Sequence, residues 1–269
     1  MTELERKAKS IRRRIIEILA KAGGGHYGGS LSCVEILTCL YFDILNINPE
    51  RPKWEERDRF ILSKGHAAAA FVCVLAERGF FPSDLLDTFN KLDSPFGMHP
   101  DMNKIPGCDM STGSLGHGLS VGVGMALAAK VDKKKFRVFV LLGDGECQEG
   151  SVWEGAMAAA HYKLDNLIAI VDRNRICMDG CTEEIMALGD LRKKWEAFGW
   201  KVREINGHNV EEILRALRSV PFEEGKPSVT IANTVKGKGV SFMENTHKWH
   251  YRAASEEETK RALGELEVV

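Results

Sequence analysis

The chain has 269 residues with 37 basic and 38 acidic side chains, and its net charge of −1 offers no basic surface of the kind that binds nucleic acid. Apolar residues make up 44 % of the sequence, which is enough for a sizeable core in one large α/β domain. The charged N-terminus lacks the apolar segment of a signal peptide, and the longest apolar run, residues 67–76, is too short to cross a membrane.

Helical patterns dominate the first half of the sequence. Residues 4–22 carry apolar side chains at helical spacing, and three consecutive glycines at 23–25 end that pattern. Residues 32–45 and 67–78 predict two further helices, and the small residues at 119–130 predict another.

Strands and helices alternate in the second half. Residues 136–142 and 166–171 are short apolar runs typical of parallel strands buried on both faces, and the helix predicted between them, 151–163, completes a βαβ unit. Further strands are predicted at 200–205 and 228–234, with helices at 210–219 and 255–266. We therefore expect residues 1–269 to form one α/β domain with a doubly wound, mainly parallel sheet flanked by helices and a helical N-terminal portion.

Two polar side chains follow neighbouring predicted strands at the points where the strands end. Asp144 comes after the first strand and Asn174 after the second, and ligands of such sheets gather at these ends. With the carbonyl of Ile176 they would give Mg²⁺ three oxygen ligands and leave room for a diphosphate, which Gly143 and Gly145 would let approach closely. The alternative is an ordinary strand-to-helix turn in which Asp144 caps the helix.

Several motifs give the sequence its resemblance to a known family. Gly143-Asp144-Gly145 with the later Asn174 resembles the motif of thiamine diphosphate enzymes, and Gln148-Glu149-Gly150 with residues 164–170 is similar to transketolases in particular. The resemblance continues at residues 25–30, 63–68, 98–100, 112–118 and 249–250.

The resemblance implies the diphosphate-binding domain of a transketolase, without the pyrimidine and C-terminal domains that follow it in a complete enzyme. We expect the N-terminal subunit of a split transketolase that transfers a two-carbon ketol unit from a ketose phosphate to an aldose phosphate. The implied cofactors are thiamine diphosphate and Mg²⁺, for which Ca²⁺ or Mn²⁺ can substitute. The expected partner is a C-terminal subunit that supplies the pyrimidine domain and its activating glutamate, so this chain should be inactive alone.

The resemblance also assigns roles to single residues. It implies that Glu149 lies at an interface between paired subunits, which favours self-association into a heterotetramer of two copies of each chain. The catalytic residues are expected to be His26, His66, His99 and His250. The cofactor is expected to contact His66, Gly113, Ser114, Leu115, Gly143, Asp144, Gly145, Glu146, Asn174, Ile176, Met178, Lys236 and His250, with Asp144, Asn174 and Ile176 on the metal.

Other polar residues are less informative. His208 is expected to cap the helix that follows it and His161 to pack, while the roles of His117 and His247 stay open. Lys64 either approaches a phosphate or is an ordinary exposed lysine.

The cysteines indicate the compartment. Seven of them, an odd number without a paired framework, indicate reduced thiols and a cytoplasmic protein. Cys177 and Cys181 do not complete a zinc site and are interpreted as ordinary loop residues.

Two other functions remain open at this point. One is another thiamine enzyme, such as the α subunit of a 2-oxo acid dehydrogenase or a 1-deoxyxylulose-5-phosphate synthase. The other is a non-catalytic partner that keeps the fold for assembly.

Overall fold

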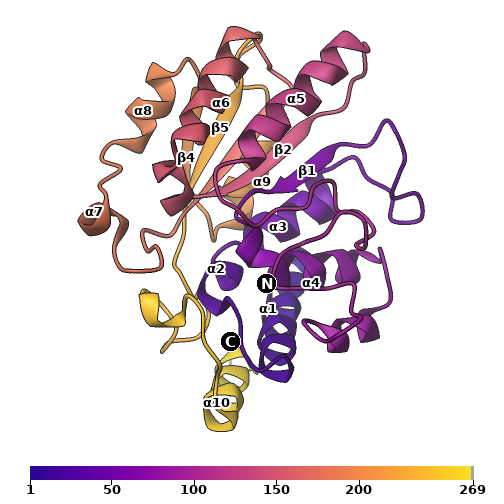
Figure 1. Ribbon diagram of the computed structural model, residues 1–269, viewed down its shortest axis with the longest axis vertical. Helices are drawn as coiled ribbons and strands as arrows, with labels where there is room; N and C mark the ends of the chain where they lie inside the picture. Colours follow the sequence, from indigo (N-terminus) through magenta and orange to yellow (C-terminus); the bar gives the residue numbers. More distant parts are fainter. Residues whose placement is uncertain (268–269) are drawn as a thin grey trace.

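A five-stranded sheet with the strand order β1-β2-β3-β5-β4 lies at the centre of the computed structural model, which describes residues 1–267 (Figure 1). All neighbouring strands are parallel. Their bounds are β1 Arg59–Leu62, β2 Val138–Gly143, β3 Leu167–Arg173, β4 Lys201–Asn206 and β5 Ser228–Asn233. The architecture confirms the predicted α/β fold.

Helices precede the first strand and cover both faces of the sheet. The α-helices are α1 Glu3–Lys21, α2 Tyr27–Leu31, α3 Val34–Cys39, α4 Ala68–Arg78, α5 Gly118–Val131, α6 Gly150–His161, α7 Thr182–Ile185, α8 Leu191–Ala197, α9 Val210–Leu217 and α10 Glu256–Glu267. Shorter helical turns are η1 Leu40–Ile44, of the π type, and the 3₁₀ turns η2 Gly65–Ala67, η3 Ser83–Thr88, η4 Gly145–Gln148 and η5 His247–Trp249. Within the described residues, no helix combines the length and apolar character needed to cross a bilayer.

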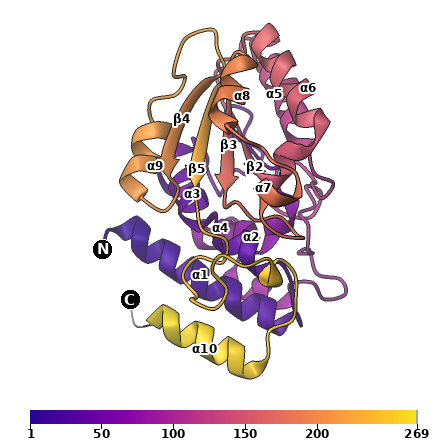
Figure 2. The same cartoon turned by 90° about the vertical axis from the view of Figure 1, so that its left-hand side faces the viewer.

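The two faces of the sheet bury alternate residues of each strand, because successive side chains of a strand point to opposite sides. In β2, Val138, Val140 and Leu142 belong to the core formed with α5, α6 and α8. Phe139 and Leu141 belong to the core formed with α1, α3, α4 and α9. Figures 1 and 2 show α5 and α6 on one side of the sheet and α3 and α9 on the other. Burial on both faces explains why these strands are continuously apolar.

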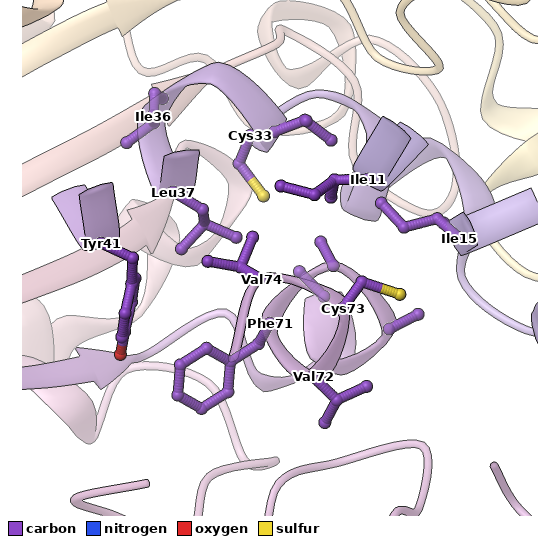
Figure 3. Packing of buried hydrophobic residues seen from close by; sticks show 14 of the residues in the cluster. Ile11, Ile15, Cys33, Ile36, Leu37, Tyr41, Phe71, Val72, Cys73 and Val74 are labelled. Carbon is purple, nitrogen blue, oxygen red and sulfur yellow. The ribbon is translucent and has the colours of Figure 1, made fainter. Parts of the chain in front are cut away.

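Helix α1 anchors the N-terminal layer. A capping box starts it, in which Thr2 accepts from the Glu5 backbone and the Glu5 carboxylate accepts from the Thr2 backbone. Its buried face places Ile11 and Ile15 against residues of α3 and α4 (Figure 3). Helix α10 packs along α1 (Figure 2). This packing fixes α1 and α3 relative to one another.

Two sequence predictions differ from the structure. The single helix expected at 32–45 is broken near Cys33, and its second half is a π turn at Leu40–Ile44. Strand β1 and helices α7 and α8 were not predicted. Strand β1 has only four residues, which is too short for a periodic pattern, and it is recognisable only through its pairing with β2. The remaining predicted strands and helices lie within a few residues of their expected bounds.

Candidate active site

Asp144 and Asn174 lie at the carboxyl ends of two paired strands. Gly143 of β2 is in register with Asp172 of β3, so the residues that follow these strands emerge side by side. Asp144 Oδ1 accepts from the Gly145 backbone at 2.9 Å, and its Oδ2 accepts from the Arg175 backbone at 2.6 Å. Asn174 Oδ1 accepts from the Ile176 backbone at 3.1 Å. Asp144 therefore caps the turn that follows it and also ties the two strand ends together.

The charge around Asp144 suits a cation. The residue is 2 % exposed, and burial together with the neighbouring Asp172 carboxylate raises the pKa of its carboxyl group. The Arg173 Nη1 atom lies 3.8 Å away, beyond hydrogen-bond distance. A carboxylate, an amide oxygen and the Ile176 carbonyl are ligands that Mg²⁺ prefers. The residues present fit a Mg²⁺ ion that takes its other ligands from phosphate and water.

Protein side chains alone do not enclose such an ion. Within residues 1–267, no three His, Cys, Asp or Glu side chains are grouped so as to hold a metal. Neither Gly143 nor Gly145 adopts a left-handed φ, so a sharp turn is not why glycine stands there. At Gly145 the reason is close packing, since a Cβ atom would lie 3.2 Å from the Cys177 side chain.

A buried ion pair lies beneath this loop. Asp172 accepts from the Lys64 ammonium, from the hydroxyl of Ser32 at 2.6 Å and from the hydroxyl of Thr234. Lys64 also donates to the Gly29 carbonyl at 2.8 Å and is 1 % exposed, so it does not reach a ligand. Burial raises the pKa of Asp172, but Lys64 lowers it further, and the net shift is downward. The sequence interpretation missed Asp172, although an aspartate inside an apolar strand is a signal that could have identified it.

Four histidines from separate segments converge beside the strand ends. His26 precedes α2, His66 lies in η2, His99 follows η3 along the chain and His250 ends η5. The His26 ring centroid lies 5.3 Å from that of His66, 6.0 Å from His99 and 5.6 Å from His250. The rings of His66 and His250 are 5.4 Å apart. The structure thus brings together all four histidines that the sequence singled out.

Burial keeps these histidines neutral. It is the largest cause of the shift that lowers the pKa of His26 to about 4 and that of His250 to about 3, and the Lys236 ammonium adds to both shifts. The pKa values of His66 and His99 are lowered as well, again chiefly by burial. In the described part of the chain, the buried Nδ1 atom of His26 has no hydrogen-bond partner. A neutral ring with an open nitrogen can accept or hold a proton at that atom.

Lys236 connects the histidines to the metal loop. Its ammonium donates to the Ile176 carbonyl at 2.7 Å and contacts His250 Nδ1 at 2.9 Å. Burial lowers the pKa of Lys236 to about 8. Helix α2 passes so close that a Cβ atom at Gly28 would lie 2.9 Å from the Lys236 side chain, which explains the glycine.

The loop that contains Gly113, Ser114 and Leu115 lies against the histidine cluster. A Cβ atom at Gly113 would lie 3.5 Å from the His99 ring. Glu146 holds this loop, since its carboxylate accepts from the Gly116 backbone at 2.9 Å and from the Gly143 backbone at 3.0 Å, and it also accepts from Ser63. Glu146 is 2 % exposed, and its observed contacts are with the protein itself.

Other candidate residues lie on the surface or elsewhere in the fold. Met178 is 63 % exposed, and Glu149, Ser114, His117 and His247 are also exposed.

Two histidine predictions were wrong. The cap of α9 is Asn209, whose side chain accepts from the Glu212 backbone, whereas the His208 ring contacts Glu35. His161 is exposed on α6 beside Tyr162 instead of packing in the core.

Comparison with known proteins identifies the family. Residues 4–266 match the family model described as the thiamine diphosphate binding domain of transketolase. The chain is 48 % identical to one of the named subunits of the apulose-4-phosphate transketolase of Phocaeicola vulgatus, over 98 % of this chain and 93 % of that protein. It is 46 % identical to the 6-deoxy-6-sulfo-D-fructose transketolase subunit SqwG of Clostridium sp. strain MSTE9, over 98 % of this chain and 96 % of that protein.

Longer transketolases match over part of their length. Human transketolase is 37 % identical over 98 % of this chain and 42 % of its own length. The crystal structure of transketolase from Campylobacter jejuni superimposes with a TM-score of 0.92 at 34 % identity, covering 98 % of this chain and 42 % of that one. The chain thus spans about two fifths of the length of the solved transketolase that it matches. It belongs to the transketolase family and corresponds to its thiamine diphosphate binding domain.

Proposed function

We propose that this member of the transketolase family is the cofactor-binding subunit of a two-chain transketolase. It would transfer a two-carbon ketol unit from a ketose phosphate to an aldose phosphate. The observation that carries the proposal is the convergence of His26, His66, His99 and His250 beside Lys236 and the strand ends that hold Asp144 and Asn174. Its similarity to proteins named as transketolase subunits, over nearly their whole length, supports the two-chain assignment.

The diphosphate end of the site would be held by oxygen ligands and one cation. Asp144, Asn174 and the Ile176 carbonyl are the proposed Mg²⁺ ligands, and Lys236 is the proposed partner of a phosphate oxygen. Gly143 and Gly145 line the approach to the metal, and Met178 is a proposed apolar neighbour of the cofactor. Bound thiamine diphosphate supplies the carbanion and the electron sink for carbon–carbon bond cleavage and formation. Mn²⁺ or Ca²⁺ is expected to substitute for Mg²⁺.

The histidines would act on the oxygens of the sugar. Because the Lys236 ammonium donates to His250 Nδ1, the ring proton of neutral His250 lies on Nε2, where it can be donated to a substrate oxygen. The open Nδ1 of His26 can hold a proton from a substrate hydroxyl. Several neutral donors around one oxygen would stabilise negative charge that develops there. His66 packs against both rings and completes this wall.

The proposed substrates are ketoses with an anionic terminus. One relative is named for a sugar phosphate and another for a sulfo-sugar, so phosphate or sulfonate would satisfy the same requirement for a negative end group. A Pichia stipitis transketolase whose structure is a complex with sedoheptulose-7-phosphate aligns with this chain at 30 % identity and a TM-score of 0.92. Pentose phosphates are the default substrates of the family resemblance.

The proposed partner chain contributes the pyrimidine domain and the glutamate that activates the cofactor. Glu149 is exposed at the start of α6 and stays our candidate for contact between two copies of this chain in an α2β2 assembly. The cysteines are all free thiols, which supports a cytoplasmic location.

The decisive experiment is reconstitution. The purified chain is mixed with its C-terminal partner, and ketol transfer from fructose-6-phosphate or xylulose-5-phosphate is measured with and without Mg²⁺ and thiamine diphosphate. We expect transfer only when both chains and both cofactors are present. Transfer by the isolated chain would contradict the two-chain proposal, and pyruvate turnover would favour a synthase or 2-oxo acid dehydrogenase. Failure of the assembled chains to bind the cofactor would favour a role in assembly alone.

A further inference from the structure

The loop that carries Lys236 is held at both of its ends by one chain of charged and polar side chains. At the first end, the Val235 backbone donates to His208 Nε2 at 2.8 Å. At the second end, Arg12 Nε donates to the Lys238 carbonyl at 3.0 Å. Glu35 joins the two, since its carboxylate contacts Arg12 Nη2 at 2.6 Å and His208 Nδ1 at 2.9 Å.

The hydrogen bonds fix the chemical form of His208. Because its Nε2 accepts from a backbone N–H, that nitrogen carries no proton. Nδ1 therefore carries the proton and donates it to Glu35. The side chain of His208 is 14 % exposed and that of Glu35 is 11 % exposed, so little water competes for these contacts. Burial raises the pKa of Glu35, but Arg12 and His208 lower it further, and the carboxylate stays charged.

The anchors of this chain belong to rigid parts of the fold. Arg12 lies on α1 and Glu35 on α3, which pack together in the core shown in Figure 3. His208 lies on the turn between β4 and α9, where its backbone donates to Asn206 Oδ1 at 3.0 Å. The loop itself is less enclosed, because Thr234, Val235 and Lys238 border a hollow of about 610 Å³. Its position therefore depends on polar contacts more than on apolar packing.

We propose that Arg12, Glu35 and His208 are positioning residues that hold residues 235–238, and with them the Lys236 ammonium, in place for the cofactor. The role toward the cofactor rests on the proposed function. None of the three side chains contacts the histidine cluster or a proposed metal ligand in the contacts of the described residues. They act through the backbone of the loop.

Two substitutions at His208 separate positioning from general stability. In His208→Gln, the side-chain oxygen reaches the place of Nε2 and can accept from Val235. In His208→Asn, the amide group reaches only the place of Nδ1, so the contact with Glu35 can persist while Val235 loses its acceptor. The matched control is His161→Asn, the same change at an exposed histidine on α6.

The first measurement is backbone hydrogen exchange of the chain without cofactor, followed by mass spectrometry of peptides covering residues 235–240. One lost hydrogen bond corresponds to about tenfold faster exchange. We expect that increase in His208→Asn, a change of less than about threefold in His208→Gln, and none in His161→Asn. Equal exchange in the Asn and Gln variants, or no change in His208→Asn, would overturn the proposal.

The second measurement is the affinity of the assembled chains for Mg²⁺ and thiamine diphosphate by calorimetry. Loss of a contact that orients a binding residue typically weakens binding by about tenfold or more. We expect about tenfold weaker binding for His208→Asn, with recovery in His208→Gln. Wild-type chains that bind no cofactor would refute the proposed function, whereas the exchange measurement would still decide whether His208 holds the loop.

Discussion

The Lys64–Asp172 ion pair gives the sharpest test of the structure, because both side chains are almost fully buried and belong to segments far apart in sequence. Lys64→Met keeps the length and most of the volume of the side chain but removes its charge and its bond to the Gly29 carbonyl. Asp172 would then be a buried charge held by Ser32 and Thr234 without a cation. Removing one partner of a buried pair costs about 3–5 kcal/mol of the free energy of unfolding.

The chain provides a matched control for this prediction. Lys130 and Asp165 also form a lysine–aspartate pair, at 2.6 Å, but their side chains are 38 % and 28 % exposed. Because surface pairs contribute about 0–1 kcal/mol, Lys130→Met should change stability little. The assay is urea unfolding of each purified variant, followed by tryptophan fluorescence. A loss below about 1 kcal/mol in Lys64→Met, equal to that of the control, would refute the assignment of a buried, charged pair.

Three further predictions concern the site. Asp144→Ala should weaken Mg²⁺-dependent binding of thiamine diphosphate at least about a hundredfold, because it removes the one charged ligand proposed for the metal; unchanged affinity by calorimetry would contradict the proposed site. Burial holds the folded-state pKa of His26 at about 4, below its unfolded value of 6.5, so its contribution to stability is present above pH 6.5 and is lost as the pH falls toward 4. The urea midpoint of the chain should therefore decrease over this range and decrease less in His26→Gln, and identical pH profiles would count against the buried neutral ring. Tyr251 is 54 % exposed with its ring 4.8 Å from that of His26, so Tyr251→Ala should raise the KM for the ketose about tenfold without changing cofactor affinity, and an unchanged KM would exclude contact with the sugar.

The elements that the sequence predicted best are those with long periodic or continuously apolar patterns. Strands β2, β3 and β5 are buried on both faces, so nearly every residue in them is apolar, and α1 shows its buried face at helical spacing. Strand β1 escaped prediction because its four residues carry too little pattern. The break between α2 and α3 also escaped, because apolar residues continue across it.

The candidate site was predicted in its membership but not in its supports. Motif spacing placed Asp144 and Asn174 at neighbouring strand ends, and parallel pairing of β2 with β3 is what brings them together. The histidines were selected by their glycine-rich or proline-flanked loops, and the structure gathers them around His26. The supports of these residues left no local pattern in the sequence.

The sequence by itself determined the α/β class, the family resemblance and the residues that would meet the cofactor, because these depend on short-range patterns and motif spacing. The tertiary structure alone decided the partners of the buried charges. Lys64 finds Asp172, and Arg12 and Glu35 find His208, across separations along the chain that no periodicity records. A buried charge is stable only beside its partner, and that partner is set by how the helices pack on the sheet.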